Sequence, residues 1–193
     1  MSMQQVATNS ILPRDITMSK AEKIGIVIDH LVDALGSEPG CTMRRAVVLT
    51  DIDEYPGTTQ AEIMKRLEID KSTLNRDIEW LYDYGCIMRR ASPTDARVQE
   101  ITICGYAKKN FDFALFYFDY DHKSLKNFLI RFIHIFDKQK PTLRDAKIVS
   151  FLGDKPSAKK QEILDHLYDG PSTTDNRAIN NLVDFGIVKK RDE

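Results

Sequence analysis

A short run of hydroxyl, amide and basic side chains in the first half of this 193-residue chain could read a nucleic acid. The residues are Lys71, Ser72, Thr73, Asn75 and Arg76. Side chains of these types donate to and accept from the edges of base pairs, or contact phosphates. The spacing of Leu74, Ile78 and Leu81 predicts a helix over residues 71–84 that places the polar run on its exposed start.

Three more arginines accompany a predicted β-hairpin downstream of this helix. Residues 86–90 and 98–103 are rich in β-forming side chains, and the turn 91–97 between them contains Ser92, Pro93 and Asp95. The arginines lie on the first strand and at the end of the turn: Arg89, Arg90 and Arg97. Cations there can neutralise phosphates, and the release of counterions gives affinity that does not depend on base sequence.

Helix signals upstream complete the unit that would position these groups. Thr59 and Glu62 form a capping-box pattern at the start of a helix that runs to Leu67, and Gly85 can end the helix over 71–84. An earlier helix ends near Tyr55-Pro56-Gly57. The order helix, helix, turn, helix, hairpin is typical of a winged helix. We therefore predict a mainly α protein with a small β-hairpin wing, of the α+β class.

The chain contains one internal repeat at an offset of about one hundred residues. Thr42-Met-Arg-Arg-Ala46 matches Thr142-Leu-Arg-Asp-Ala146, and after one inserted residue Asp83-Tyr-Gly85 matches Asp184-Phe-Gly186. Two copies of one supersecondary unit explain such a repeat. The predicted architecture is a tandem winged helix-turn-helix joined by long amphipathic helices.

The first copy, over roughly residues 19–120, resembles the MarR family of transcription regulators. Residues 59–67, 70–76, 81–85 and 89–97 carry the resemblance. The most specific motif is Asp95-x-Arg97 in the wing. In that family the wing arginine reaches the DNA and the wing aspartate steadies the hairpin, so the resemblance implies these roles for Arg97 and Asp95. It also implies a homodimer, built by a helix before the winged helix and by helices after it.

These signals divide the chain into four parts. We expect a flexible N-terminal arm (1–18) and a MarR-like winged-helix DNA-binding domain (19–105), whose leading helix Ser19 and Glu22 cap. An aromatic-rich helical linker or dimerisation region (106–140) and a second winged-helix-like domain (141–193) follow. The aromatic side chains of residues 106–140 can serve the core, a subunit interface, or both.

The second copy supports two interpretations. It stops directly after its predicted first strand, so it has no wing of its own, which favours a role in protein contact or dimerisation. Its third helix is polar, which favours a second DNA-binding site. The residues that would form this site are Ser172, Thr173, Thr174, Asn176, Arg177 and Asn180.

No motif for catalysis stands out. The sequence lacks a nucleophile elbow, a phosphate-binding glycine loop and the usual zinc spacings, so we expect no enzyme, no metal site and no cofactor. Asp51, Asp53 and Glu54 cluster near a helix end, where we expect a solvated turn. The three cysteines form no C-x-x-C pair and fit reduced thiols. Without a spanning segment or signal peptide, we expect a cytoplasmic protein with no membrane contact.

Charge limits how the chain could hold DNA. The net charge is −1, although residues 65–109 carry nine Lys and Arg against seven Asp and Glu. A near-neutral protein can bind double-stranded DNA only through a local patch. We predict a sequence-specific transcription regulator, a repressor, that reads DNA with the helix 71–84 and the wing 91–97. The alternatives are a tandem winged-helix scaffold that binds proteins and a plasmid or phage replication initiator.

Overall fold

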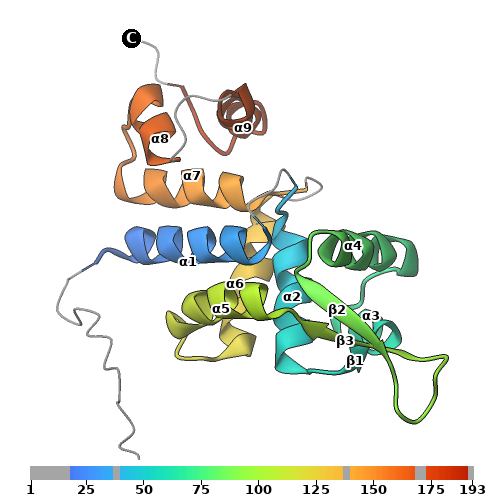
Figure 1. Cartoon of the computed structure of the whole chain (residues 1–193). Coiled ribbons are helices and arrows are strands. Elements are labelled where there is room, and N and C mark those ends of the chain that lie inside the picture. Colours follow the sequence, from blue (N-terminus) through green and yellow to red (C-terminus); the bar gives the residue numbers. More distant parts are fainter. Residues whose placement is uncertain (1–17, 37–39, 137–139, 168–172, 191–193) are drawn as a thin grey trace, which may run out of the picture.

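The computed structural model describes residues 18–36, 40–136, 140–167 and 173–190. Over these ranges the chain forms nine helices and three short strands (Figure 1). The helices are α1 (Lys20–Ala34), α2 (Met43–Glu54), α3 (Gln60–Leu67), α4 (Lys71–Asp83), α5 (Gly105–Phe116), α6 (His122–Ile135), α7 (Leu143–Asp154), α8 (Lys160–His166) and α9 (Thr173–Asp184). The strands are β1 (Thr58–Thr59), β2 (Ile87–Ala91) and β3 (Gln99–Ile103). The predicted α+β class with a small sheet is confirmed.

The predicted helix signals lie where the helices begin and end. Ser19 and Glu22 form a capping box at the start of α1, and Thr59 and Glu62 form one at the start of α3. Gly85 follows α4 with a φ of 68°, a left-handed conformation that glycine adopts without strain. The local signals of the sequence therefore fix the ends of the first helices.

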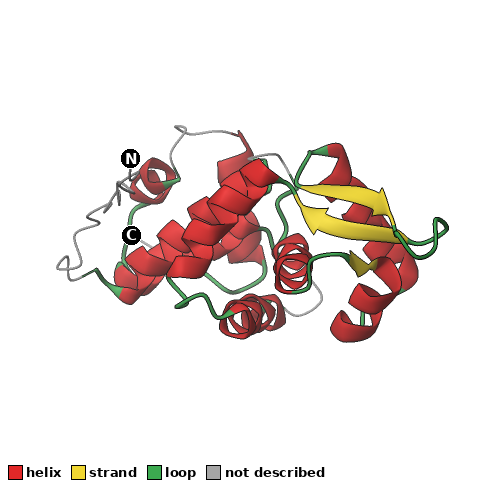
Figure 2. Cartoon of the chain, turned by 60° about the horizontal axis from the view of Figure 1, so that its bottom comes forward, coloured by secondary structure: helices red, strands yellow, loops and turns green. Residues whose placement is uncertain are grey.

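The sheet has the strand order β1-β3-β2, and all pairs are antiparallel. In the β2–β3 hairpin Ile87 lies opposite Ile103 and Ala91 lies opposite Gln99. Figure 2 shows this hairpin projecting from the helical body as a wing. The two-residue strand β1, which the sequence did not predict, adds Thr58 opposite Ile101 and ties the start of α3 to the sheet.

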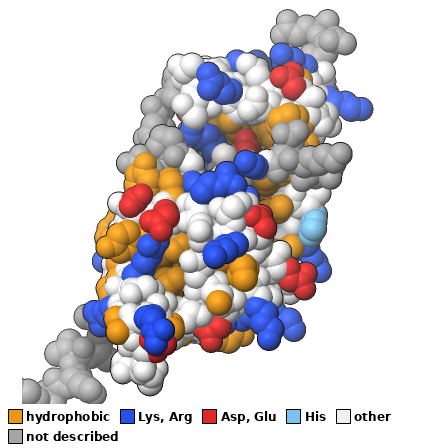
Figure 3. Space-filling model, turned by 90° about the vertical axis from the view of Figure 1, so that its right-hand side faces the viewer, with side chains coloured by type: hydrophobic (Ala, Val, Ile, Leu, Met, Phe, Trp, Pro, Cys, Tyr) orange, Lys and Arg blue, Asp and Glu red, His pale blue; other side chains and the backbone are white. Residues whose placement is uncertain are grey.

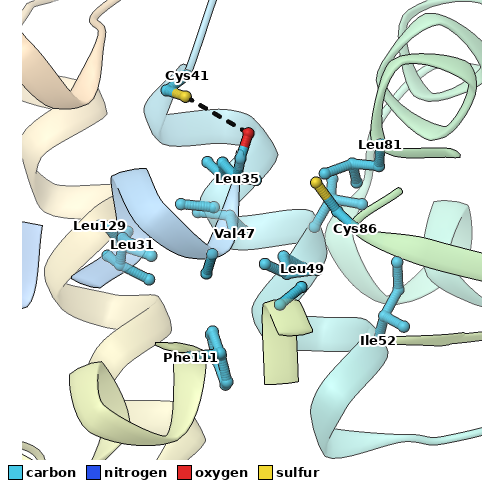
Figure 4. Packing of buried hydrophobic residues seen from close by; sticks show 14 of the residues in the cluster. Leu31, Leu35, Cys41, Val47, Leu49, Ile52, Leu81, Cys86, Phe111 and Leu129 are labelled. Atoms are coloured by element: carbon cyan, nitrogen blue, oxygen red, sulfur yellow. Dashed lines mark hydrogen bonds between the residues drawn. The ribbon is translucent and has the colours of Figure 1, made fainter. Parts of the chain in front are cut away.

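One core joins the helices of the first half of the chain to α6 and the start of α7. Leu31 of α1, Leu49 of α2, Phe111 of α5 and Leu129 of α6 are fully buried in it (Figure 4). The aromatic-rich segment therefore contributes side chains of two helices, α5 and α6, to this core. A row of rings nonetheless remains exposed along and after α5: Tyr106, Phe113, Phe116 and Tyr120.

A smaller core holds α7, α8 and α9 together, with Ile148, Ile163, Ile179 and Leu182 at its centre. The backbone conformation that ends α2 recurs at the end of α7. Tyr55 after α2 has φ −128° and ψ 72°, and Lys155 after α7 has φ −128° and ψ 73°. The three helices of this part thus follow one another as α2, α3 and α4 do, and α7 ends in the same backbone conformation as α2.

The strand predicted at the end of the second copy is absent from the described residues. Residues 187–190 follow α9 as irregular chain, and the N–H groups of Ile187 and Val188 both donate to the carbonyl of Leu182. The prediction was wrong because a β-forming run needs a partner strand for its backbone groups, and this run has none among the described residues.

The acidic cluster of α2 was also predicted wrongly. Asp51 and Asp53 are buried on the side of α2 that faces α6. Asp51 pairs with Arg66 at 2.7 Å and Lys126 at 3.2 Å, and Asp53 pairs with Lys108 at 3.1 Å and His122 at 2.9 Å. Basic side chains far away in sequence reach this face, so the carboxylates are buried and paired instead of solvated.

Two further expectations concern the N-terminal arm and the absence of membrane-spanning segments. The proposed arm, residues 1–18, lies outside the described residues apart from Met18. Within the described ranges, no helix has the length and apolar character needed to cross a membrane.

Candidate nucleic-acid interface

The turn between α3 and α4 sets the start of the helix that carries the predicted reading residues. Glu68 has a left-handed φ of 53°, which reverses the chain after α3. Asp70 then caps α4, because its carboxylate accepts from the Thr73 N–H at 2.9 Å and the Ser72 hydroxyl at 2.8 Å. Hydrogen bonds from the side chain of Thr73, from its N–H and from the Ser72 hydroxyl favour the charged carboxylate and lower the pKa of Asp70 to about 2. The first turn of α4 is therefore stabilised by hydrogen bonds from its own residues to the Asp70 carboxylate.

A buried carboxylate fixes the orientation of α4 on α2. Asp77 is 1% exposed and accepts from Arg44 Nε at 2.5 Å and Arg45 Nε at 3.3 Å. The Arg45 guanidinium also lies 4.2 Å from the centre of the Trp80 ring. This anchor was not predicted from the sequence, although an aspartate beside the apolar row of a helix and two adjacent arginines are a usable signal. The anchor turns the opposite face of α4 to solvent.

The predicted reading residues occupy that outward face. Lys71, Ser72, Asn75 and Arg76 are exposed, and Thr73 is half-buried. The guanidinium of Arg76 stays close to its own helix, since its Nε donates to the Ser72 carbonyl at 3.3 Å. The Asn75 side-chain oxygen accepts from the Gln60 amide of α3. The first turns of α4 thus present a polar surface that is already organised by α3.

The wing ends in a turn closed by its aspartate. The Asp95 carboxylate accepts from the Arg97 N–H at 3.0 Å, and the Asp95 carbonyl accepts from the Val98 N–H at 2.9 Å. The Ser92 N–H donates to the Val98 carbonyl at 2.8 Å, which closes the base of the loop. The Arg97 side chain is 95% exposed, and its Nε lies 3.6 Å from the Asp95 carboxylate. The wing therefore carries one nearly free cation at its end.

The two arginines of β2 differ from each other. Arg90 is exposed at the end of the strand. Arg89 is half-buried: its guanidinium pairs with Glu79 at 2.9 Å and lies 4.7 Å from the centre of the Tyr82 ring. Arg89 thus links the wing to α4, whereas Arg90 is available to a partner at the surface.

Charge on this side of the molecule is mixed. Figure 3 shows the side on which α4 and the wing lie in Figure 1, with Lys and Arg spread over it and Asp, Glu and hydrophobic side chains between them. A net charge of −1 agrees with this distribution. Any affinity for phosphates must therefore come from a few well-placed cations and not from a broad basic field.

The predicted second site lies on α9, apart from Ser172, which falls outside the described residues. Thr173, Thr174, Arg177 and Asn180 are exposed, and Asn176 is half-buried. Asp175 on the inner face is buried and pairs with Arg144 of α7 at 3.1 Å. α9 thus resembles α4 in having a polar outer face and an inner carboxylate held by an arginine of the preceding long helix.

Comparisons with known proteins bear on the first half of the chain. Residues 41–98, from the start of α2 to the end of the wing loop, match the model of the MarR family. No curated protein matches the chain.

Several solved structures are similar to part of it. The transcriptional regulator SlyA is 19% identical, with 57% of this chain and 87% of that chain covered and a TM-score of 0.39. FabT from Streptococcus pneumoniae, solved in complex with DNA, is 16% identical, with 68% and 82% covered and a TM-score of 0.39. MepR from S. aureus, also solved in complex with DNA, is 18% identical, with 56% and 87% covered and a TM-score of 0.37.

Proposed function

We propose that this chain is a sequence-specific DNA-binding transcription regulator of the MarR type, acting as a repressor in the cytoplasm without catalysing a reaction. The observation that carries the proposal is the combination of a polar outer face on α4 with the exposed Arg97 at the end of the wing. The match of residues 41–98 to the MarR family covers the same two elements.

In this proposal α4 enters the major groove with its first turns. Asn75 and Arg76 are the side chains best suited to base edges, because an amide pairs with adenine and a guanidinium with guanine. Lys71, Ser72 and Thr73 lie in the turn that would pass the phosphates, and Asp77 holds the helix at its angle. Arg97 reaches the neighbouring minor groove or backbone, and Asp95 keeps the wing turn closed for it.

The remaining cations have supporting roles in the same proposal. Arg90 contacts phosphate beside the wing, and Arg89 keeps β2 in register with α4 through Glu79. The alternative stoichiometry, the homodimer that the family resemblance implies, would use the exposed rings on and after α5, Tyr106, Phe113, Phe116 and Tyr120. Sedimentation of the free chain measures whether those rings associate.

A selection from random duplexes with the purified chain tests the proposal. It should return one preferred sequence, and Arg76→Ala or Asn75→Ala should relax the preference at one base pair at a cost of about 1–3 kcal/mol. Asp83→Ala, at the exposed far end of the same helix, is the matched change, and it should leave base preference in place. A chain that selects no sequence, or whose preference is unchanged in both variants, contradicts the assignment of α4. A chain that binds no duplex but retains a protein partner would favour the scaffold alternative.

A further inference from the structure

The repeat includes one more helix than the winged-helix unit. The order α1, α2, α3, α4 is matched by the order α6, α7, α8, α9, so each copy has a leading helix before its long helix. The leading helices are exchanged: α1 of the first copy packs along α7 of the second, and α6 of the second copy packs along α2 of the first. Figure 1 shows both pairings. An exchange in both directions is the arrangement of a two-fold dimer, here within one chain.

The backbone marks the position of this local two-fold. Thr42 pairs with Thr142 in an isolated antiparallel bridge, and these are equivalent residues of the two copies. The Met43 N–H donates to the Pro141 carbonyl at 3.0 Å, and the Leu143 N–H donates to the Cys41 carbonyl at 2.9 Å. The two hydrogen bonds are mutual equivalents, so the axis passes between Thr42 and Thr142.

Buried polar contacts close both exchanged interfaces. On the α1–α7 side Lys147, 6% exposed, pairs with Asp29 at 2.6 Å, and the Ser150 hydroxyl donates to the Ala21 carbonyl at 2.9 Å. On the α2–α6 side Lys126 pairs with the fully buried Asp51 at 3.2 Å. Such contacts need defined geometry, which holds the two copies in a fixed relation.

The same axis relates the two polar helices. α4 is fixed to the first turn of α2 through Arg44 and Asp77, and α9 is fixed to the first turn of α7 through Arg144 and Asp175. These first turns lie beside the Thr42–Thr142 bridge. A two-fold rotation leaves the height along its axis unchanged, so this symmetry places α4 and α9 at the same level, one on each side of the bridge.

We propose that a single chain binds one duplex with both helices, α4 on one half-site and α9 on the other. The proposal rests on the proposed function for α4 and adds the second contact and the stoichiometry. Since a duplex has local two-fold axes of its own, the two half-sites are in inverted orientation. The α9 contacts come from Thr174, Arg177 and Asn180, which are exposed on its outer face. The winged half-site alone receives a contact from Arg97. One chain thus supplies both reading helices for the DNA complex, whereas in the homodimer that the family resemblance implies they would come from two chains.

The test uses the full chain and the duplex recovered by selection. Light scattering after size-exclusion chromatography should give one chain per duplex, and footprinting should show protection of two half-sites. Arg177→Ala should weaken binding at least about five-fold and remove protection from one half only. Arg76→Ala should remove protection from the other half. Lys23→Ala, an exposed lysine on α1, is the control and should change neither.

The outcomes distinguish a failure of this inference from a failure of the proposed function. If Arg76→Ala weakens binding while Arg177→Ala has the affinity and footprint of the parent chain, α9 is no reader and this inference fails although α4 still binds DNA. Two chains per duplex, each using α4, would overturn it in the same way. If the parent chain binds no duplex, the proposed function itself fails. A melting temperature of Arg177→Ala equal to that of the parent chain shows that a lost half-site is not a folding defect.

Discussion

Removal of the wing cation is the cleanest perturbation that the structure offers. The Arg97 side chain is 95% exposed, and its ionic neighbour Asp95 is 3.6 Å away at the surface. Arg97→Ala should therefore leave the free energy of unfolding within about 0.5 kcal/mol of the parent chain. Any change in DNA affinity then reports on the contact itself and not on the fold.

The size of the effect follows from counterion release. One lost phosphate contact lowers the slope of log K against log salt by about 0.9. Between 50 and 200 mM salt, the ratio of parent to variant affinity should therefore shrink about 3.5-fold. The assay is a titration of the selected duplex at four or five salt concentrations, with Lys23→Ala as the control because α1 begins on the side away from the wing (Figure 1). Parallel salt plots for Arg97→Ala and the parent chain would refute the placement of this arginine on DNA.

Three further predictions concern stability. Asp51→Ala should lower the free energy of unfolding in a urea titration by about 3–5 kcal/mol, because it leaves Arg66 and Lys126 around an empty buried position. Asp83→Ala, at the exposed end of α4, should change the free energy of unfolding by less than about 0.5 kcal/mol in the same titration, and equal effects of the two variants would contradict the buried network. Asp29→Ala should destabilise the chain more than Lys147→Met, because the first change removes the carboxylate 2.6 Å from an ammonium whose side chain is 6% exposed, whereas the second leaves a carboxylate whose side chain is 31% exposed and reaches water. The reverse order in thermal unfolding would argue against the α1–α7 pairing. Asp70→Asn should make stability less dependent on pH, since the lowered pKa of Asp70 gives stability that is present above about pH 4 and is lost as the pH falls towards about 2. If the variant has the same pH profile of urea unfolding over this range as the parent chain, the result would be evidence against the cap.

Helix starts and turns were predictable where residues close together in the sequence determine them. Ser19 with Glu22 and Thr59 with Glu62 fixed helix starts, because a capping box satisfies backbone groups within four residues. The wing turn was predictable for the same reason, since Asp95 accepts from an N–H two residues later. The exposure of the predicted reading residues of α4 followed from the apolar row of Leu74, Ile78 and Leu81, which leaves the opposite face exposed.

Features that depend on contacts between residues far apart in the sequence were not predicted. Asp51 and Asp53 look like a solvated turn until Lys126 of α6 and Lys108 of α5 are brought against them by the fold. The run 187–190 has strand-forming residues, but pairing, which a single run cannot encode, decides strand formation. The exchange of α1 and α6 also depends on tertiary packing, although the repeat itself was visible at the offset of about one hundred residues.

A two-fold arrangement with one wing among the described residues has a consequence for how DNA would be read. A homodimer on a palindrome is the same in both directions, so it cannot mark which side of the site faces a promoter. In a single chain with two reading helices, Arg97 contacts only the half-site under α4, and the site becomes directional. The sequence bound by α4 and the wing should then be read over more base pairs than the sequence bound by α9. Such an unequal pair of half-sites would let one chain set its own orientation on the duplex.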